Sequence, residues 1–201
     1  MHAGRTVQID SHAADTLRYI RASMEAAALL RVPGSLAIAA GIVGLLAASM
    51  SSIPAFGVHW LIVWIVAAFA AASVGTILLL RHSPAGTLTI AGSPVRKFAL
   101  GFVPSLAAGA VLTFVLWTGG HEQLISGAWL ILYGCALISA SATATRIMAH
   151  IGSAFFALGV LALLAPGEVQ ILLLGTGFGA LHILLGILIG HAERRASSEQ
   201  D

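Results

Sequence analysis

The chain has 201 residues, of which 58% are hydrophobic and only 9% are charged. Soluble domains usually carry about 25% charged residues, so this composition excludes an ordinary water-exposed surface. The formal net charge is only +2, and the ten basic residues are spread over short connections and both termini. This spread excludes a concentrated nucleic-acid-binding patch. The composition indicates instead that most of the chain lies inside a lipid bilayer.

The first 32 residues form a separate segment ahead of the long apolar stretches. Within 11–31, apolar side chains recur at helical spacing, whereas Arg18, Arg21 and Glu25 share another face. Arg21 and Glu25 are four residues apart and can pair on a helix. We therefore predict a cytoplasmic amphipathic helix in the segment 1–32. It would lie at the membrane surface or at the inner mouth of the bundle, or it would dock a soluble partner.

Six stretches without Asp, Glu, Lys or Arg follow this segment. A bilayer core about 30 Å thick requires roughly 20 apolar residues in helical form, and each stretch meets this length. The connections between them are short and contain turn-forming residues, so consecutive helices should pack as antiparallel neighbours. We predict an all-α, polytopic membrane protein whose six transmembrane helices form a compact bundle over 33–191. The predicted spans are 33–51, 56–80, 98–118, 124–143, 147–165 and 169–190.

The charges between the spans predict an orientation. All ten Lys and Arg residues lie in the N-terminal segment, in the second and fourth connections, or in the tail. The other three connections carry only Glu122 and Glu168 as charged residues. Because basic residues collect on the cytoplasmic side, both termini should be cytoplasmic in a bacterial inner membrane, with 192–201 as a short disordered tail. An aromatic belt is predicted at the outer ends of spans two to four from Trp60, Trp64, Trp117 and Trp129.

The sixth span contains the strongest candidate for a functional residue, His182. Four glycines recur around it at intervals of three or four residues, which predicts one shared helical face: Gly175, Gly179, Gly186 and Gly190. Small residues let a neighbouring helix approach closely, so His182 should be buried near the middle of the membrane. An ionisable residue there is a candidate for ligand binding or proton handling. The alternative is a neutral imidazole that bonds a carbonyl or hydroxyl across the interface and fixes helix register.

His150 is a second ligand candidate, about one turn inside the cytoplasmic end of the fifth span. With a rise of about 1.5 Å per residue, His150 and His182 differ in depth by roughly 8 Å. That separation is too large for one metal ion unless a helix is tilted or broken. The single cysteine, Cys135, excludes an internal disulfide and a multi-cysteine metal site. The sequence therefore predicts no metal and no cofactor.

Three segments carry a family resemblance: 129–134, 152–159 and 177–182. They resemble a group of uncharacterised bacterial six-helix inner-membrane proteins, a resemblance that covers most of the chain and implies no known activity. The spans lack the Gly-x-Ser-Gly motif of rhomboid intramembrane proteases, since the fourth span reads Gly134-Cys135-Ala136-Leu137. They also lack paired carboxylates and a nucleophile–base set, so the sequence favours a non-enzymatic protein.

Two non-enzymatic functions remain open. The favoured one is a structural or regulatory membrane subunit that docks a soluble cytoplasmic protein through the N-terminal helix; a homo-oligomer is the other possible assembly. The alternative is the binding or passage of a small neutral or apolar molecule through the bundle. The absence of carboxylates from the spans argues against transport driven by protons or sodium. The predicted partners are therefore lipid and protein, not nucleic acid.

Overall fold

The computed structural model describes residues 17, 33–57, 59–82 and 94–198. The regular structure in this part of the chain is helical, and six helices are long and apolar enough to cross a membrane. This confirms the all-α prediction and the number of long apolar helices. The predicted N-terminal helix, with Arg18, Arg21 and Glu25, lies outside the described residues. The first five long helices are α2 (Gly34–Ser51), α4 (Trp60–His82), α5 (Pro94–Thr118), α6 (Ile125–Ser141) and α7 (Arg146–Leu164).

The sixth long helix has three parts. It begins with α8 (Gln170–Leu174), passes through the π-helix η3 (Gly175–Leu181) and ends with α9 (His182–Ser198). The helix therefore continues through most of 192–201, and the prediction of a disordered tail there is wrong. The reason is local, because Ala192-Glu193-Arg194-Arg195-Ala196 consists of strong helix formers.

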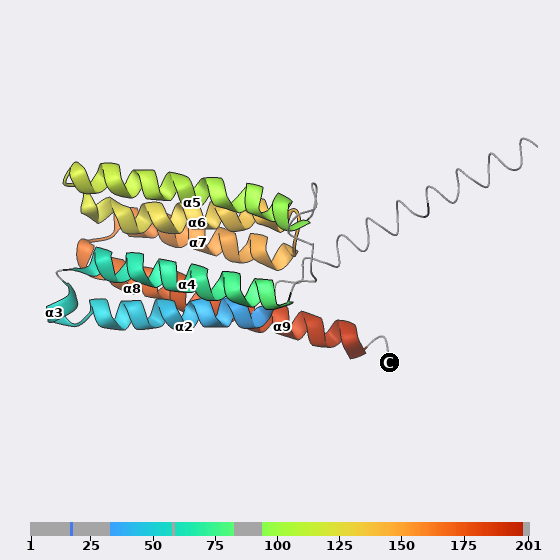
Figure 1. The fold of residues 1–201 in the computed structure, drawn as a ribbon. Helices are drawn as coiled ribbons and strands as arrows, with labels where there is room; N and C mark the ends of the chain where they lie inside the picture. The colour runs from blue at the N-terminus through green and yellow to red at the C-terminus, as the bar shows by residue number, and fades with distance from the viewer. Residues whose placement is uncertain (1–16, 18–32, 58, 83–93, 199–201) are drawn as a thin grey trace, which may run out of the picture.

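Three short elements lie in the connections at one end of the bundle: α3 (Pro54–Gly57), η1 (Glu122–Leu124) and η2 (Gly167–Val169). The second long helix consequently begins at Trp60, later than the predicted start at residue 56. The separate turn of α3 fits its sequence, since Pro54 suits the first position of a helix and Gly57 its end. Figure 1 shows α3 at the end of the bundle opposite the C-terminus.

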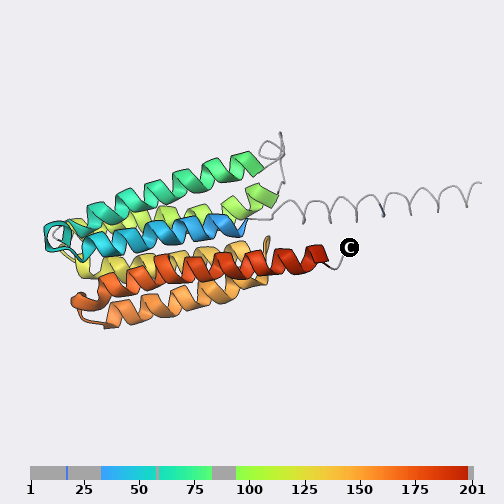
Figure 2. The ribbon, with the colours of Figure 1, turned by 90° about the horizontal axis from the view of Figure 1, so that it is seen from below.

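The six long helices form two layers of three (Figures 1 and 2). In one layer α2 is central and packs against α4 and the last helix; in the other, α6 is central and packs against α5 and α7. Consecutive helices are thus neighbours in the pairs α2–α4, α5–α6 and α6–α7, as predicted. Two steps depart from this rule. α4 and α5 are not packed against each other, because they belong to different layers, and the last helix has the first long helix, α2, as its main partner rather than α7.

Each layer contains one helix pair whose backbones approach closely at glycines. Between α6 and α7, a Cβ atom added at Gly134 would lie 2.6 Å from the carbonyl oxygen of Gly152, and one at Gly159 would lie 2.9 Å from that of Gly127. These four residues define the α6/α7 seam. Only glycine allows this separation, because any side chain would meet the backbone of the facing helix.

The second close pair joins α2 to the last helix. A Cβ atom added at Gly34 or at Gly186 would collide with the carbonyl oxygen of the other residue. One added at Gly41 would lie 2.8 Å from the carbonyl oxygen of Gly179. We call these four residues the α2/α9 seam. On every helix of both seams the two glycines are seven residues apart, which is about two helical turns.

Each layer has one outer helix that is covered by little protein, α4 in the first layer and α5 in the second. Only 6% of the apolar window in each is buried, compared with 44% in the window that contains α6. Their exposed side chains include Phe69, which is 72% exposed, and Phe114, which is 65% exposed. These helices therefore present long apolar faces to the surroundings, and the buried contacts concentrate around α6 and the last helix.

Candidate functional site

His182 is the first residue of α9, directly after the π-helix, and its side chain is only 6% exposed. The prediction that it is buried in the bundle is confirmed. Its Nε2 atom lies 2.7 Å from the hydroxyl oxygen of Tyr133 on α6, so one of the two groups donates a hydrogen bond to the other. This bond links the two layers, because Tyr133 belongs to one and His182 to the other.

Aromatic rings surround this pair. The His182 ring lies 5.1 Å from the Tyr133 ring, 5.3 Å from Phe155 on α7 and 6.0 Å from Phe178 on the π-helix, measured between centroids. Tyr133, Phe155 and Phe178 also contact one another, at centroid distances between 5.0 and 5.4 Å. Trp64 from α4 packs against Phe178 at 5.9 Å. We call these five residues the aromatic cluster. Such ring pairs contribute beyond simple area burial, so the cluster fixes how the layers meet.

The π-helix changes the face on which His182 lies. Its glycines Gly175 and Gly179 approach α2, as does Gly186 further along. The ring contacts of His182, however, are with α6 and α7, so His182 does not share the face that the sequence analysis assigned to it. A π-helix closes its hydrogen bonds over five residues instead of four, so positions beyond it are rotated from the 3.6-residue spacing that the prediction assumed.

The glycines predicted for that face differ in their surroundings. Gly186 lies against Gly34, and a Cβ atom at Gly175 would lie 2.8 Å from the side chain of Ala48 on α2. Gly190 is different, because a Cβ atom there would meet nothing within 4 Å. Close helix approach therefore accounts for Gly175, Gly179 and Gly186, while Gly190 lies at the rim of the contact.

The surroundings of His182 suit a structural hydrogen bond. Its Nδ1 atom is buried and makes no hydrogen bond within the described part of the chain, although the backbone of Gly177 and Phe178 lies beside the ring. No carboxylate or basic side chain contributes to the aromatic cluster. Over residues 33–57, 59–82 and 94–198, no three His, Cys, Asp or Glu side chains gather closely enough to hold a metal ion. The group can fix helix register, because its hydrogen bond joins α9 to α6.

His150 does not join this site. It is exposed on α7, and its Nδ1 atom lies 2.9 Å from the carbonyl oxygen of Arg146, one turn earlier on the same helix. This contact is local to α7, so the structure separates the two histidines that the sequence analysis considered together.

His182 is the one member of the aromatic cluster that the sequence predicts as a site residue; the sequence does not predict Tyr133, Phe155, Phe178 or Trp64. Tyr133 supplies the hydroxyl for His182, and a tyrosine in the middle of an apolar span was the available signal. Trp64 was assigned to an aromatic belt, but it is 4% exposed because it packs into the cluster, so that assignment is wrong. Trp117 is 54% exposed near the end of α5, as a belt residue would be.

Comparison with protein-family models, with curated proteins and with solved structures finds no match for this chain.

Proposed function

We propose that the chain is a multi-pass protein of the bacterial inner membrane with both termini in the cytoplasm. The apolar faces of α4 and α5 support this proposal, since lipid would cover them at no desolvation cost. The charges support the orientation, because Glu122 and Glu168 lie in connections at the end opposite the C-terminus. The basic residues within the described helices lie toward the other end: Arg81, Arg96, Lys97, Arg146, Arg194 and Arg195. The resemblance to bacterial six-helix inner-membrane proteins belongs to the same proposal.

Reporter fusions test this orientation. A reporter that is active only in the periplasm should be active after Gly120 and after Gly167, and inactive after Arg81. The physical reason is the concentration of basic residues on one side, which the membrane insertion machinery retains in the cytoplasm. Activity after Arg81, or inactivity after either glycine, would contradict the orientation.

We further propose that the bundle is a rigid scaffold and that the protein is a structural or regulatory membrane subunit. The observation that carries this proposal is the bond between His182 and Tyr133 inside a filled aromatic cluster. The cavities at the two ends of the bundle are not lined by His182, and the ring packing favours a scaffold over passage of a small neutral or apolar molecule. Partner binding is then assigned to the cytoplasmic segment 1–32, through Arg18, Arg21 and Glu25.

The size of the protein extracted in mild detergent tests the subunit hypothesis. The full chain should run in a complex heavier than its own 20.6 kDa plus bound detergent. A variant with Arg18→Ala, Arg21→Ala and Glu25→Ala should run as the free chain, because the docking charges are removed. The matched control is Arg194→Ala with Arg195→Ala, which removes basic residues elsewhere and should leave the complex intact.

Native mass spectrometry of the same samples would identify the partner class. A mass in whole multiples of 20.6 kDa would indicate copies of this chain, and another mass would indicate a different protein. A free monomer for the unmodified chain, or an equal loss in both variants, would contradict the subunit hypothesis. Deleting residues 1–30 should still give a membrane-inserted product, because the six apolar spans remain.

A further inference from the structure

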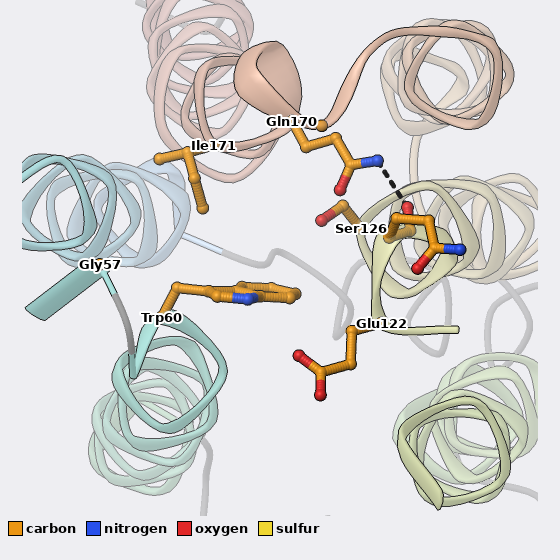
Figure 3. A pocket seen from close by; sticks show the side chains of 8 residues that line it. Gly57, Trp60, Glu122, Ser126, Gln170 and Ile171 are labelled. Atoms are coloured by element: carbon orange, nitrogen blue, oxygen red, sulfur yellow. Dashed lines mark hydrogen bonds between the residues drawn. The ribbon is translucent and has the colours of Figure 1, made fainter. Parts of the chain in front are cut away.

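A cavity of about 250 Å³ lies where α3 and the two short helices η1 and η2 meet, far along the last helix from His182. Its lining comes from three different connections of the chain, so it forms only when both layers are assembled. Trp60 begins α4, Glu122 and Ser126 lie in η1 and α6, and Gln170 begins α8. Figure 3 shows these four side chains around the cavity.

Ser126 indicates that the cavity has a polar occupant. Its side chain is 1% exposed, and its hydroxyl makes no hydrogen bond within the described residues. Leaving a buried hydroxyl without a partner costs about 1–3 kcal/mol, so a ligand that supplies the missing hydrogen bond stabilises this end of the bundle. In Figure 3 the hydroxyl is turned toward the space beside the Trp60 indole.

Gln170 supplies a second oriented oxygen. The residue is only 7% exposed, and its Nε2 atom donates a hydrogen bond to the carbonyl oxygen of Gln123. This bond fixes the amide, so that the side-chain oxygen points to the same space as the Ser126 hydroxyl (Figure 3). A fixed amide oxygen accepts hydrogen bonds, and the site therefore selects a donor.

Trp60 and Glu122 add the features that attract a positive charge. The Trp60 ring is held by Trp129, with 6.5 Å between the ring centroids, and it projects into the cavity. Glu122 also lines the cavity, as an exposed residue whose carboxylate lies on the other side of the Trp60 ring from the Ser126 and Gln170 oxygens in Figure 3. No basic side chain lines the cavity. Cations are attracted both to an indole face and to a carboxylate.

The charge distribution of the whole chain points the same way. Glu122 and Glu168 are the charged residues in the connections at this end, while all ten basic residues belong to the other connections and the termini. A field of one sign around a cavity raises the local concentration of oppositely charged ligands. The size of the cavity limits the ligand, because pockets for drug-sized molecules usually measure about 300–1,000 Å³.

We propose that this cavity binds a small organic cation with a primary ammonium group. The ammonium donates hydrogen bonds to the Gln170 oxygen and the Ser126 hydroxyl oxygen, while the short carbon chain packs on the Trp60 ring. The Glu122 carboxylate attracts the positive charge from the other side of this ring. A primary ammonium has N–H donors for both oxygen acceptors. The binding site is separate from the His182 cluster. A bound ligand would stabilise the end of the bundle that is proposed to face the periplasm.

Calorimetric titration of the full chain in detergent micelles with propylammonium tests the site, with propanol as the uncharged analogue. At pH 8, where unperturbed histidines are neutral, propylammonium should bind and propanol should bind at least about tenfold more weakly. Glu122→Gln should weaken propylammonium binding by about threefold to fivefold, because it removes the charge of an exposed carboxylate that lines the cavity. Ser126→Ala should weaken it by about threefold to tenfold, since one acceptor is lost.

Glu168→Gln is the matched control, because Glu168 and Glu122 are both exposed acids at the same end and only Glu122 lines the cavity. It should change the affinity by less than about twofold, as expected for an exposed charge that does not line the site. Equal binding of propanol and propylammonium, or no binding of either, would overturn the proposal. An equal loss of affinity in Glu168→Gln and Glu122→Gln would also overturn it, because binding would then depend on the overall negative charge at this end and not on the cavity.

Discussion

The α6/α7 seam and the α2/α9 seam are both close backbone contacts at glycines, but only the second includes a π-helix. Both bring antiparallel backbones together at glycines seven residues apart, and in both a Cβ atom would meet the facing carbonyl. The α6/α7 seam runs through two regular helices, whereas the α2/α9 seam runs through the π-helix. The comparison shows that glycine spacing sets the close approach, and that the π-helix decides what else the helix can contact.

That difference gives the last helix two functions in packing. Gly179 and Gly186 keep the contact with α2, while the turn between them directs His182 toward Tyr133 and Phe155 in the other layer. The α6/α7 seam has no such turn, yet its regular helices also reach the other layer, through Tyr133 on α6 and Phe155 on α7. On the last helix, the π-helix rotates His182 away from the face of the seam glycines, so that this helix packs against α2 and also bonds α6.

The largest effect is expected from breaking either seam at its backbone contacts. Gly134→Ala and Gly34→Ala each place a Cβ atom against a facing carbonyl, so each should lower the free energy of unfolding by about 1–3 kcal/mol or more. Gly75→Ala is the control, because a Cβ atom there meets nothing within 4 Å on α4. It should be neutral or stabilise by up to about 1 kcal/mol, since alanine favours helix.

Reversible unfolding in mixed detergent and SDS micelles measures these changes. If Gly34→Ala and Gly75→Ala unfolded at the same SDS fraction, the close approach in the α2/α9 seam would be wrong. If only Gly134→Ala lowered the free energy of unfolding, glycine would be needed for close helix approach between α6 and α7 but not between α2 and α9.

A smaller effect sharpens the comparison within the α2/α9 seam. A Cβ atom at Gly41 would lie 2.6 Å from the side chain of Ile183 and also 2.8 Å from the carbonyl oxygen of Gly179. One at Gly179 would lie 2.5 Å from the flexible side chain of Leu45, and its nearest backbone atom would be 3.4 Å away. Gly41→Ala should therefore destabilise more than Gly179→Ala, for which we expect about 1 kcal/mol, the low end of the usual cost of overpacking. The same unfolding assay compares them, and the reverse order would contradict the packing described for this seam.

The long helices were predictable because the spans carry no charged residues and their connections contain turn formers. Their partners were less predictable. In apolar spans nearly every face is hydrophobic, so the pattern does not mark a buried side. A spacing of seven residues separates the glycines on each helix of the α6/α7 seam: Gly127 and Gly134, and Gly152 and Gly159. This spacing alone does not show which two helices pair. The pairing depends on the facing glycines lying at the same depth, which only the assembled layers show.

The candidate site was predictable in part for a similar reason. A histidine in a charge-free span must be buried and bonded to a polar group, and this much followed from the sequence. Its partner, Tyr133, depends on the rotation that the π-helix introduces, and no propensity marks that helix beyond its glycines. The outer cavity was not predicted, because Trp60, Ser126 and Gln170 come from connections that are distant in sequence and meet only in the fold.

The smallest effect is expected at the bond between the central and outer helices of one layer. The indole N–H of Trp129 on α6 donates to the hydroxyl of Thr113 on α5, at 2.7 Å. Hydrogen bonds between membrane helices average about 0.6 kcal/mol, so Thr113→Val should destabilise by about that amount. A loss comparable to that of Gly134→Ala would show that α5 is held mainly by this bond, contrary to the apolar packing described here.

The bond between His182 and Tyr133 is the central claim, and a double-mutant cycle in the same unfolding assay tests it most directly. His182→Phe and Tyr133→Phe each keep an aromatic ring in the cluster and remove one partner of the bond. If the bond joins the two layers, the single and double variants should give a coupling energy of about 0.6–1.7 kcal/mol, the range found between membrane helices. Strictly additive effects of the two substitutions would contradict the claim.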